Sequence, residues 1–275
     1  MRRSSPVLPG FRLTLGFAIA YLGFFLVIPV TALVVRSFSL DGSRVVSVIS
    51  DPRTVAAFRV SFVCSLAAAA INTFLGLATA WVLERYEFGG RRFLDALVDL
   101  PFAIPTAVAG ITLAALYGPR GAIGAPLAAL GLRVAYTQLG IVLALMFVTL
   151  PFAVRTIQPV IKALDPEVEA AAESLGANGW ERFRKVLLPE IRPALLTAFG
   201  LAFARALGEY GSVIFIAGNL PMKTEIAPLL IMMKLEQFDY DGATAIAMTY
   251  LVVALLLVIF VHRSHRRQMR RLEES

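Results

Sequence analysis

The chain has 275 residues, of which 58% are hydrophobic and only 16% charged, and its mean hydropathy is +0.74. This composition excludes an ordinary soluble globular protein. The net charge of +7 raises the question of a nucleic-acid partner, but no recognition motif accompanies it, and the single Cys64 excludes an intramolecular disulfide.

Six apolar segments are long enough to cross the hydrocarbon core of a bilayer, which takes roughly 20 apolar residues. In chain order they cover residues 13–35, 60–83, about 93–117, 134–154, about 193–216 and 242–261. They predict an all-α polytopic membrane protein with six transmembrane helices. Because these spans leave little chain for anything else, we expect a single transmembrane domain over residues 1–275.

Lysine and arginine are distributed unevenly between the two sides of the predicted spans. Arg2, Arg3, the turn after Arg85, the stretch 155–192 and the basic tail 262–271 all fall on one side. The positive-inside rule therefore predicts that both termini are cytoplasmic.

The segments on the opposite side predict three kinds of connection. Residues 37–59 are expected to form an outer loop, and residues 118–133 an outer loop with a short surface helix. The third segment begins with turn residues at 218–221 and then runs apolar over 226–233, which is too short to span. We expect a re-entrant or interfacial helix there.

A polar stretch between the fourth and fifth spans is patterned as two short helices. Asp165 is a good N-cap, Pro166 suits the first helical position, and Gly176 supplies a left-handed stop. One face of this first helix carries Val168, Ala171, Ala172 and Leu175. Such a small-residue face predicts close docking into the groove of a soluble partner.

The second short helix is predicted from its boundaries. Asn178 and Glu181 have the spacing of a capping box, and Pro189 and Pro193 are expected to limit the helix. The whole stretch, about 163–190, is therefore predicted to be a cytoplasmic coupling loop.

Two charged residues lie inside the fifth apolar segment. Arg205 and Glu209 are four residues apart, so they can pair along one helix face. One interpretation is a self-neutralising structural pair. The other is that they line a translocation path, because charges within a membrane normally face a bundle interior or a water-filled cavity.

Asp95 and Asp99 lie one turn apart near the start of the third segment. They are interpreted either as partners of the helix dipole and the membrane interface or, for Asp99, as part of a gate at the cytoplasmic mouth.

Nothing in the sequence predicts catalysis or nucleotide binding by this chain. The P-loop pattern is missing, and His262 and His265, the two histidines, both lie in the basic tail. We therefore expect no metal site and no enzymatic activity. An ion-coupled secondary carrier using Asp95, Asp99 or Glu209 is an alternative, although it needs no docking loop.

The polar stretch resembles the EAA loop of ATP-binding-cassette importer permeases, in which Glu-Ala-Ala precedes a glycine by fixed spacing. Gly176 is followed after nine residues by Val186 and then by Leu188-Pro189, as in that family, but the family's glutamate falls on Ala170. The resemblance implies contact with an ATPase through Glu169, Ala170, Ala171, Ala172, Leu175, Gly176, Val186, Leu188 and Pro189.

Residues 203–247 resemble sulfate/thiosulfate permeases of the CysT type, while the Arg205–Gly211 core is similar to molybdate permeases as well. The resemblance implies a type I importer (MetI-like) permease in the bacterial inner membrane. Molybdate, tungstate or another oxyanion is the alternative cargo.

Four further expectations come from this resemblance. Two cytoplasmic ATPase copies would use the ATP, so this chain would bind no cofactor of its own. A related permease would complete a heterodimeric pore in the lipid, and a soluble sulfate-binding protein would dock outside near Asn219, Lys223 and Thr224. Independently of the resemblance, Arg205, Glu209 and Asp99 are the residues that would line the path or its gate.

Overall fold

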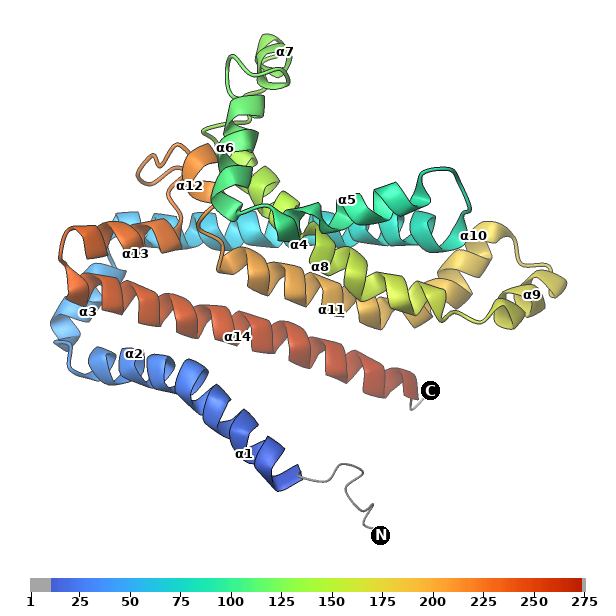
Figure 1. The fold of residues 1–275 in the computed structure, drawn as a ribbon, viewed down its shortest axis with the longest axis horizontal. Helices are drawn as coiled ribbons and strands as arrows, with labels where there is room; N and C mark the ends of the chain where they lie inside the picture. Colours follow the sequence, from blue (N-terminus) through green and yellow to red (C-terminus); the bar gives the residue numbers. More distant parts are fainter. Residues whose placement is uncertain (1–10, 274–275) are drawn as a thin grey trace.

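The computed structural model describes residues 11–273, which form helices and connecting turns without a β-strand among them (Figure 1). Arg2 and Arg3 lie outside the described residues, and so do the side chains of the basic tail. Five helices are long and apolar enough to span a membrane, and a bent pair of helices gives a sixth span if it is counted as one. The prediction of an all-α membrane fold is confirmed.

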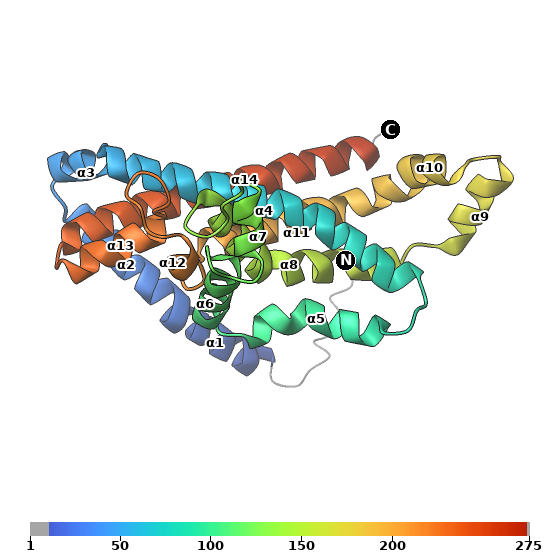
Figure 2. The ribbon, with the colours of Figure 1, turned by 90° about the horizontal axis from the view of Figure 1, so that it is seen from above.

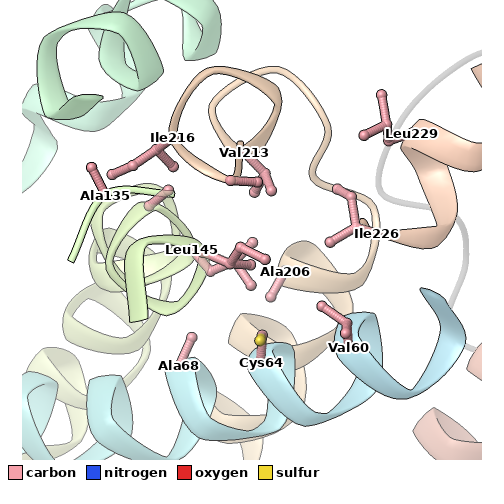
Figure 3. Packing of buried hydrophobic residues seen from close by; sticks show 13 residues of the cluster. Val60, Cys64, Ala68, Ala135, Leu145, Ala206, Val213, Ile216, Ile226 and Leu229 are labelled. Atoms are coloured by element: carbon pink, nitrogen blue, oxygen red, sulfur yellow. The ribbon is translucent and has the colours of Figure 1, made fainter. Parts of the chain in front are cut away.

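Three long helices form the centre of the bundle. They are α4 (Pro52–Arg85), α8 (Gln138–Lys162) and α11 (Leu188–Leu207), and they pack against one another. Their contact faces carry small residues such as Cys64, Ala68 and Ala206, all almost fully buried (Figure 3). Small side chains allow close approach of helix backbones, which is how membrane helices associate without a hydrophobic driving force.

The two ends of the chain provide the outer helices of the bundle. The first span is continuous from α1 (Phe11–Leu22) through the π-helical turn η1 (Gly23–Val27) into α2 (Ile28–Phe38). Its apolar side chains are almost all exposed in this single chain, and α2 contacts the last helix, α14 (Tyr240–Glu273).

The segment predicted as an outer loop at 37–59 is largely helical. It contains α3 (Gly42–Ile49), and α4 already begins at Pro52. Asp41 and Asp51 cap these two helices by accepting hydrogen bonds from backbone N–H groups two residues ahead. The second span was predicted to begin at residue 60, where the uncharged run starts, whereas the helix begins at Pro52, after the N-cap Asp51.

The other two outer predictions hold at the level of secondary structure. A short helix, α7 (Gly124–Ala129), lies within 118–133, and α13 (Ala227–Glu236) covers the apolar run after the 218–221 turn. Helices α3 and α13 lie at one end of the bundle, and the polar stretch at 165–191 lies at the other (Figures 1 and 2).

The third predicted span is broken into two helices. α5 (Arg91–Ala103) and α6 (Thr106–Tyr117) are bent by 110° at Ile104 and Pro105. Ile104 is extended, with φ −87° and ψ 125°, as expected for a residue before proline. Helix α6 therefore leaves the bundle direction and carries α7 away from it (Figure 1).

The fifth predicted span, 193–216, was wrong at both ends. The helix runs without interruption over Gly179–Leu207, through α10 (Gly179–Arg182), the π-helical turn η2 (Phe183–Leu187) and α11. It ends at Leu207, and a separate short helix, α12 (Val213–Ile216), follows. The helix tolerates Pro189 because this residue lies in the first turn of α11, directly after η2. There the regular helical hydrogen-bond pattern is already interrupted.

Candidate functional site

The polar stretch folds as its caps predict. In α9 (Pro166–Ser174) the Asp165 side chain accepts a hydrogen bond from the Glu167 N–H at 2.8 Å. Gly176 follows the helix with φ +84°, a conformation that L side chains rarely adopt. Asn178 and Glu181 form the predicted capping box at the start of α10. The local sequence thus fixes both helix starts and the turn between them.

An apolar face on this stretch is open to solvent in the single chain. Leu175 is 89% exposed, Trp180 is 67% exposed and Val168 is 42% exposed. Ala170 and Ala171 are exposed as well. Exposed apolar groups on a short capped helix are typical of an interaction site, because burial against a partner removes them from water.

Three residues that the resemblance assigned to the docking face lie elsewhere. Val186 and Leu188 are half-buried, in η2 and at the start of α11, beside the buried Leu187. Pro189 is exposed but belongs to the membrane helix. Val186 and Leu188 are thus less accessible than the exposed apolar residues of α9 and α10, although α9 contacts η2, which contains Val186. The prediction that Pro189 and Pro193 limit a second short helix was wrong, since the helix continues through both.

Glu169 also departs from the predicted face, because it is turned toward its own chain. Its carboxylate forms an ion pair with Arg85 at the end of α4, and the two side chains are 18% and 24% exposed. The sequence placed Arg85 in a cytoplasmic turn, so this contact between distant segments was not predicted.

Arg205 and Glu209 form the predicted ion pair, with 2.7 Å between Nη1 and Oε2. The Glu209 side chain is 2% exposed and the Arg205 side chain 33%. The helix ends before Glu209, however, so the two residues do not share a helix face. Glu209 instead lies in the turn before α12, where Oε1 accepts hydrogen bonds from the backbone N–H and the hydroxyl of Ser212.

Asp95 and Asp99 face a cation that the sequence analysis had placed in a loop. Arg155 belongs to α8 and forms ion pairs of 2.6 Å with both carboxylates. Its Nη2 also donates to the Asp95 carbonyl, and its Nη1 to Gln158. The acids therefore hold α5 against α8, and neither lies in the first turn of α5. This arrangement favours ion pairing over a helix-dipole role.

The three residues predicted to face a binding protein do not form one surface. Lys223 is exposed, and its carbonyl accepts a hydrogen bond from Gln138. Thr224 is buried, and its hydroxyl accepts from the Leu220 N–H, while Asn219 has a positive φ of 51° and donates to the Ile214 carbonyl. Of the three side chains, that of Thr224 is not available to a partner.

The sequence analysis missed a second buried ion pair, at the end of the bundle that carries α3 and α13. Arg53, near the start of α4, contacts Glu225 through two hydrogen bonds of 2.7 Å, and Glu225 is buried completely. The signal in the sequence was Glu225, an acid just before the apolar helix α13. Its partner Arg53 lies 172 residues earlier in the chain.

Comparisons with known proteins agree with the predicted resemblance. The chain is 47% identical to the sulfate transport system permease protein CysT of Escherichia coli (strain K12), over 98% of this chain and 97% of the relative. It is 46% identical to the CysT protein of Synechococcus elongatus, over 90% of this chain and 88% of the relative.

Solved structures show the same fold. A bacterial ABC transporter that imports the acidic polysaccharide alginate has a chain with a TM-score of 0.78 and 18% identity, covering 94% of this chain and 95% of that one. The MetNI methionine ABC transporter gives a TM-score of 0.55 at 20% identity, over 79% of this chain and 94% of that one.

The sequence profile described as "Binding-protein-dependent transport system inner membrane component" matches residues 72–274. This range includes the polar stretch at 163–190, the bent pair α5 and α6, and the last span. The chain therefore belongs to the family of binding-protein-dependent transport system inner membrane components, which are ABC importer permeases and not enzymes.

Proposed function

We propose that this chain is a permease subunit of an ATP-driven importer of sulfate and thiosulfate. The observation that carries the proposal is the 47% identity, over almost the full length, to a relative named as a sulfate transport permease. The exposed apolar face of α9 and α10 supports the ATP-driven mechanism, because a carrier coupled to an ion gradient has no need of a docking surface for an ATPase.

In the proposed complex, two copies of a cytoplasmic ATPase bind and hydrolyse ATP, and this chain binds no nucleotide. One ATPase contacts Val168, Ala171 and Leu175 on the open face. A second, related permease completes the pore, and an extracytoplasmic sulfate-binding protein delivers the anion to the end that carries α3, α13 and the exposed Lys223.

The proposed route of the anion passes Arg205. Its guanidinium is one-third exposed although it lies on a membrane-spanning helix, so it offers a cation at the bundle surface. Glu209 neutralises it in the present state, which favours brief passage of an anion over stable binding. Asp99 on α5, which is paired with Arg155 of α8, is proposed to hold the cytoplasmic gate closed.

The proposed topology places both termini on the cytoplasmic side of the inner membrane. In a Cys64→Ser background, cysteines introduced at Ser43 and Lys223, both exposed, should react with an impermeant reagent added outside intact cells. A cysteine at Gly89, exposed in the turn after α4, should react only after the cells are opened. The reverse pattern would show an inverted protein.

The cargo is tested in liposomes that contain this chain with its partner permease, the ATPase and the binding protein. We expect ATP-dependent uptake of labelled sulfate that unlabelled thiosulfate reduces and molybdate does not. Stronger competition by molybdate than by thiosulfate would assign the chain to molybdate or tungstate. Uptake that persists without ATP while an ion gradient is present would refute the ATP-driven mechanism.

A further inference from the structure

One ion pair connects the coupling helix α9 to the central helix α4. Arg85 is the last residue of α4, and its Nη2 donates to Oε1 of Glu169, 84 residues later in the chain. Both side chains are less than one-quarter exposed. An ion pair in such a half-buried position is screened less by water and salt than an exposed pair. It can therefore hold two elements in a fixed relation.

An aromatic cluster extends this connection to the beginning of the next span. The Arg85 guanidinium lies 5.2 Å from the ring centre of Trp81, one turn earlier on α4. Trp81 contacts Phe183 edge to face at 5.7 Å, and Phe183 stacks on Trp180 at 5.8 Å. Cation–π and aromatic contacts of this geometry add stability beyond area burial. The end of α4 is thereby held by Glu169 of α9 through Arg85, and by Phe183 of η2 through Trp81.

The position of the acid explains its orientation. Successive residues on an α-helix are rotated by about 100° around the axis, so neighbours point to different sides. Ala170, at the position where the family pattern has glutamate, is exposed, whereas Glu169 is turned inward to Arg85. In this chain Glu169, the acid nearest to that motif position, forms its ion pair with a residue of the permease itself.

The remaining ion pair of α9 stays within the coupling loop. Glu173 binds Arg182 on α10 at 2.8 Å, nine residues along the chain, and Glu173 is 71% exposed. Such a pair fixes the angle between α9 and α10. It does not connect α9 to α4, which contacts both α8 and α11 along the bundle.

We propose that Arg85 is a positioning residue that joins the coupling helix α9 to α4, so that the two move as one body when the ATPase moves α9. The proposal rests on the proposed ATP-driven function and identifies α4 as the helix that receives the movement of α9. Without the pair, α9 still presents its apolar face to the ATPase, but its displacement is taken up by the loop and not passed to α4.

The first test compares assembly, ATP hydrolysis and sulfate uptake for Arg85→Gln, Glu169→Gln and the double variant in the complete complex. We expect normal co-purification of the ATPase and continued hydrolysis, with sulfate uptake per ATP reduced about tenfold in each variant. The double variant should be no worse than either single one, because all three lose the same contact. Lys185→Gln, which removes the exposed pair with Glu181 in the same loop, is the control and should retain normal uptake.

Two outcomes of this test would overturn the proposal. Unchanged uptake per ATP in both single variants would show that the pair transmits nothing. Loss of ATPase association in Glu169→Gln alone would show that Glu169 serves the partner and not α4.

A second measurement needs no cargo and separates this inference from the proposed function. Spin labels at Ala78 on α4 and Ser174 on α9, both exposed, report the distance between the two helices in a Cys64→Ser background. We expect a narrow distance distribution that is the same without nucleotide and with ATP trapped, and a broad one in Arg85→Gln. Equal distributions in both proteins would refute the link even if sulfate uptake is normal. If the wild-type complex takes up no sulfate, the proposed function fails, and the distances still decide the link.

Discussion

Replacing Arg205 by leucine removes the cation that faces the buried carboxylate of Glu209. In the structure Glu209 forms an ion pair with Arg205 at 2.7 Å and accepts two hydrogen bonds, from the N–H and hydroxyl of Ser212, at 2.9 and 3.0 Å. Its side chain is 2% exposed, so water cannot replace the lost guanidinium. The reciprocal change, Glu209→Leu, leaves a guanidinium that is 33% exposed and so less buried than the carboxylate. The two single substitutions should therefore differ in cost.

The magnitude follows from this asymmetry in burial. Removing one partner of a buried ion pair typically costs 3–5 kcal/mol, and the two remaining hydrogen bonds from Ser212 place Arg205→Leu at about 3 kcal/mol. Glu209→Leu also leaves the Ser212 N–H without its acceptor, so we expect roughly 1–2 kcal/mol. Since 1 kcal/mol corresponds to about 2–4 °C for a chain of this size, Arg205→Leu should lower the unfolding midpoint by about 6–12 °C.

The assay is thermal unfolding of the purified protein in detergent, read together with its abundance in the membrane. Arg192→Leu is the control, because Arg192 is an exposed arginine on the same helix. We expect little change in its midpoint. A midpoint for Glu209→Leu equal to or below that of Arg205→Leu would refute the argument from burial.

The double substitution Arg205→Leu/Glu209→Leu separates a structural pair from residues on the anion path. Removing both charges leaves no uncompensated ion, so membrane abundance should recover in part. We expect that sulfate uptake nevertheless stays low, because the cation at the bundle surface is gone. Normal uptake by the double variant would remove both residues from the path.

Two glycine substitutions test close geometry. Gly176→Val forces a β-branched residue into positive φ at a cost of about 1–3 kcal/mol, so ATPase co-purification and uptake should fall while Gly179→Ala, at an unstrained position, keeps both. Gly110→Ala places a Cβ 2.3 Å from the Ser212 carbonyl oxygen, and we expect a lower unfolding midpoint. Gly16→Ala, with open space around it, should be neutral or stabilising; a midpoint for Gly110→Ala as high as that of Gly16→Ala would contradict the close contact.

The features predicted correctly from the sequence are those decided within a few residues. The cap at Asp165, the left-handed Gly176 and the capping box at Asn178 and Glu181 involve contacts between residues two to four positions apart. Apolar length likewise predicts membrane spans, because bilayer thickness is a fixed external requirement. These signals are local in the sequence, so a single sequence contains them completely.

The features that the sequence analysis missed depend on partners far along the chain. Arg85 with Glu169 and Arg155 with Asp95 join residues 84 and 60 positions apart, and neither pairing has a local signature. The break at Pro105 was visible as a proline, but Pro193 lies inside a continuous helix. Proline alone therefore does not decide between a break and a tolerated position; the packing of the surrounding helices does.

The two ends of α4 are held by different kinds of ion pair. At the end near α13 Arg53 binds the fully buried Glu225 through Nε and Nη2, and Ser61 on the same helix accepts the Ala227 N–H at 2.8 Å. A bidentate pair has a more specific geometry than a single hydrogen bond.

At the coupling end, by contrast, Arg85 donates one hydrogen bond to Glu169, while its buried Nε has no hydrogen-bond partner among the described residues. That hydrogen bond joins the end of α4 to α9. Helix α4 is thus held by more hydrogen bonds at the end near α13 than at the end near α9. If α9 and α4 move together as proposed, the largest movement of α4 should occur near Trp81 and the smallest near Arg53.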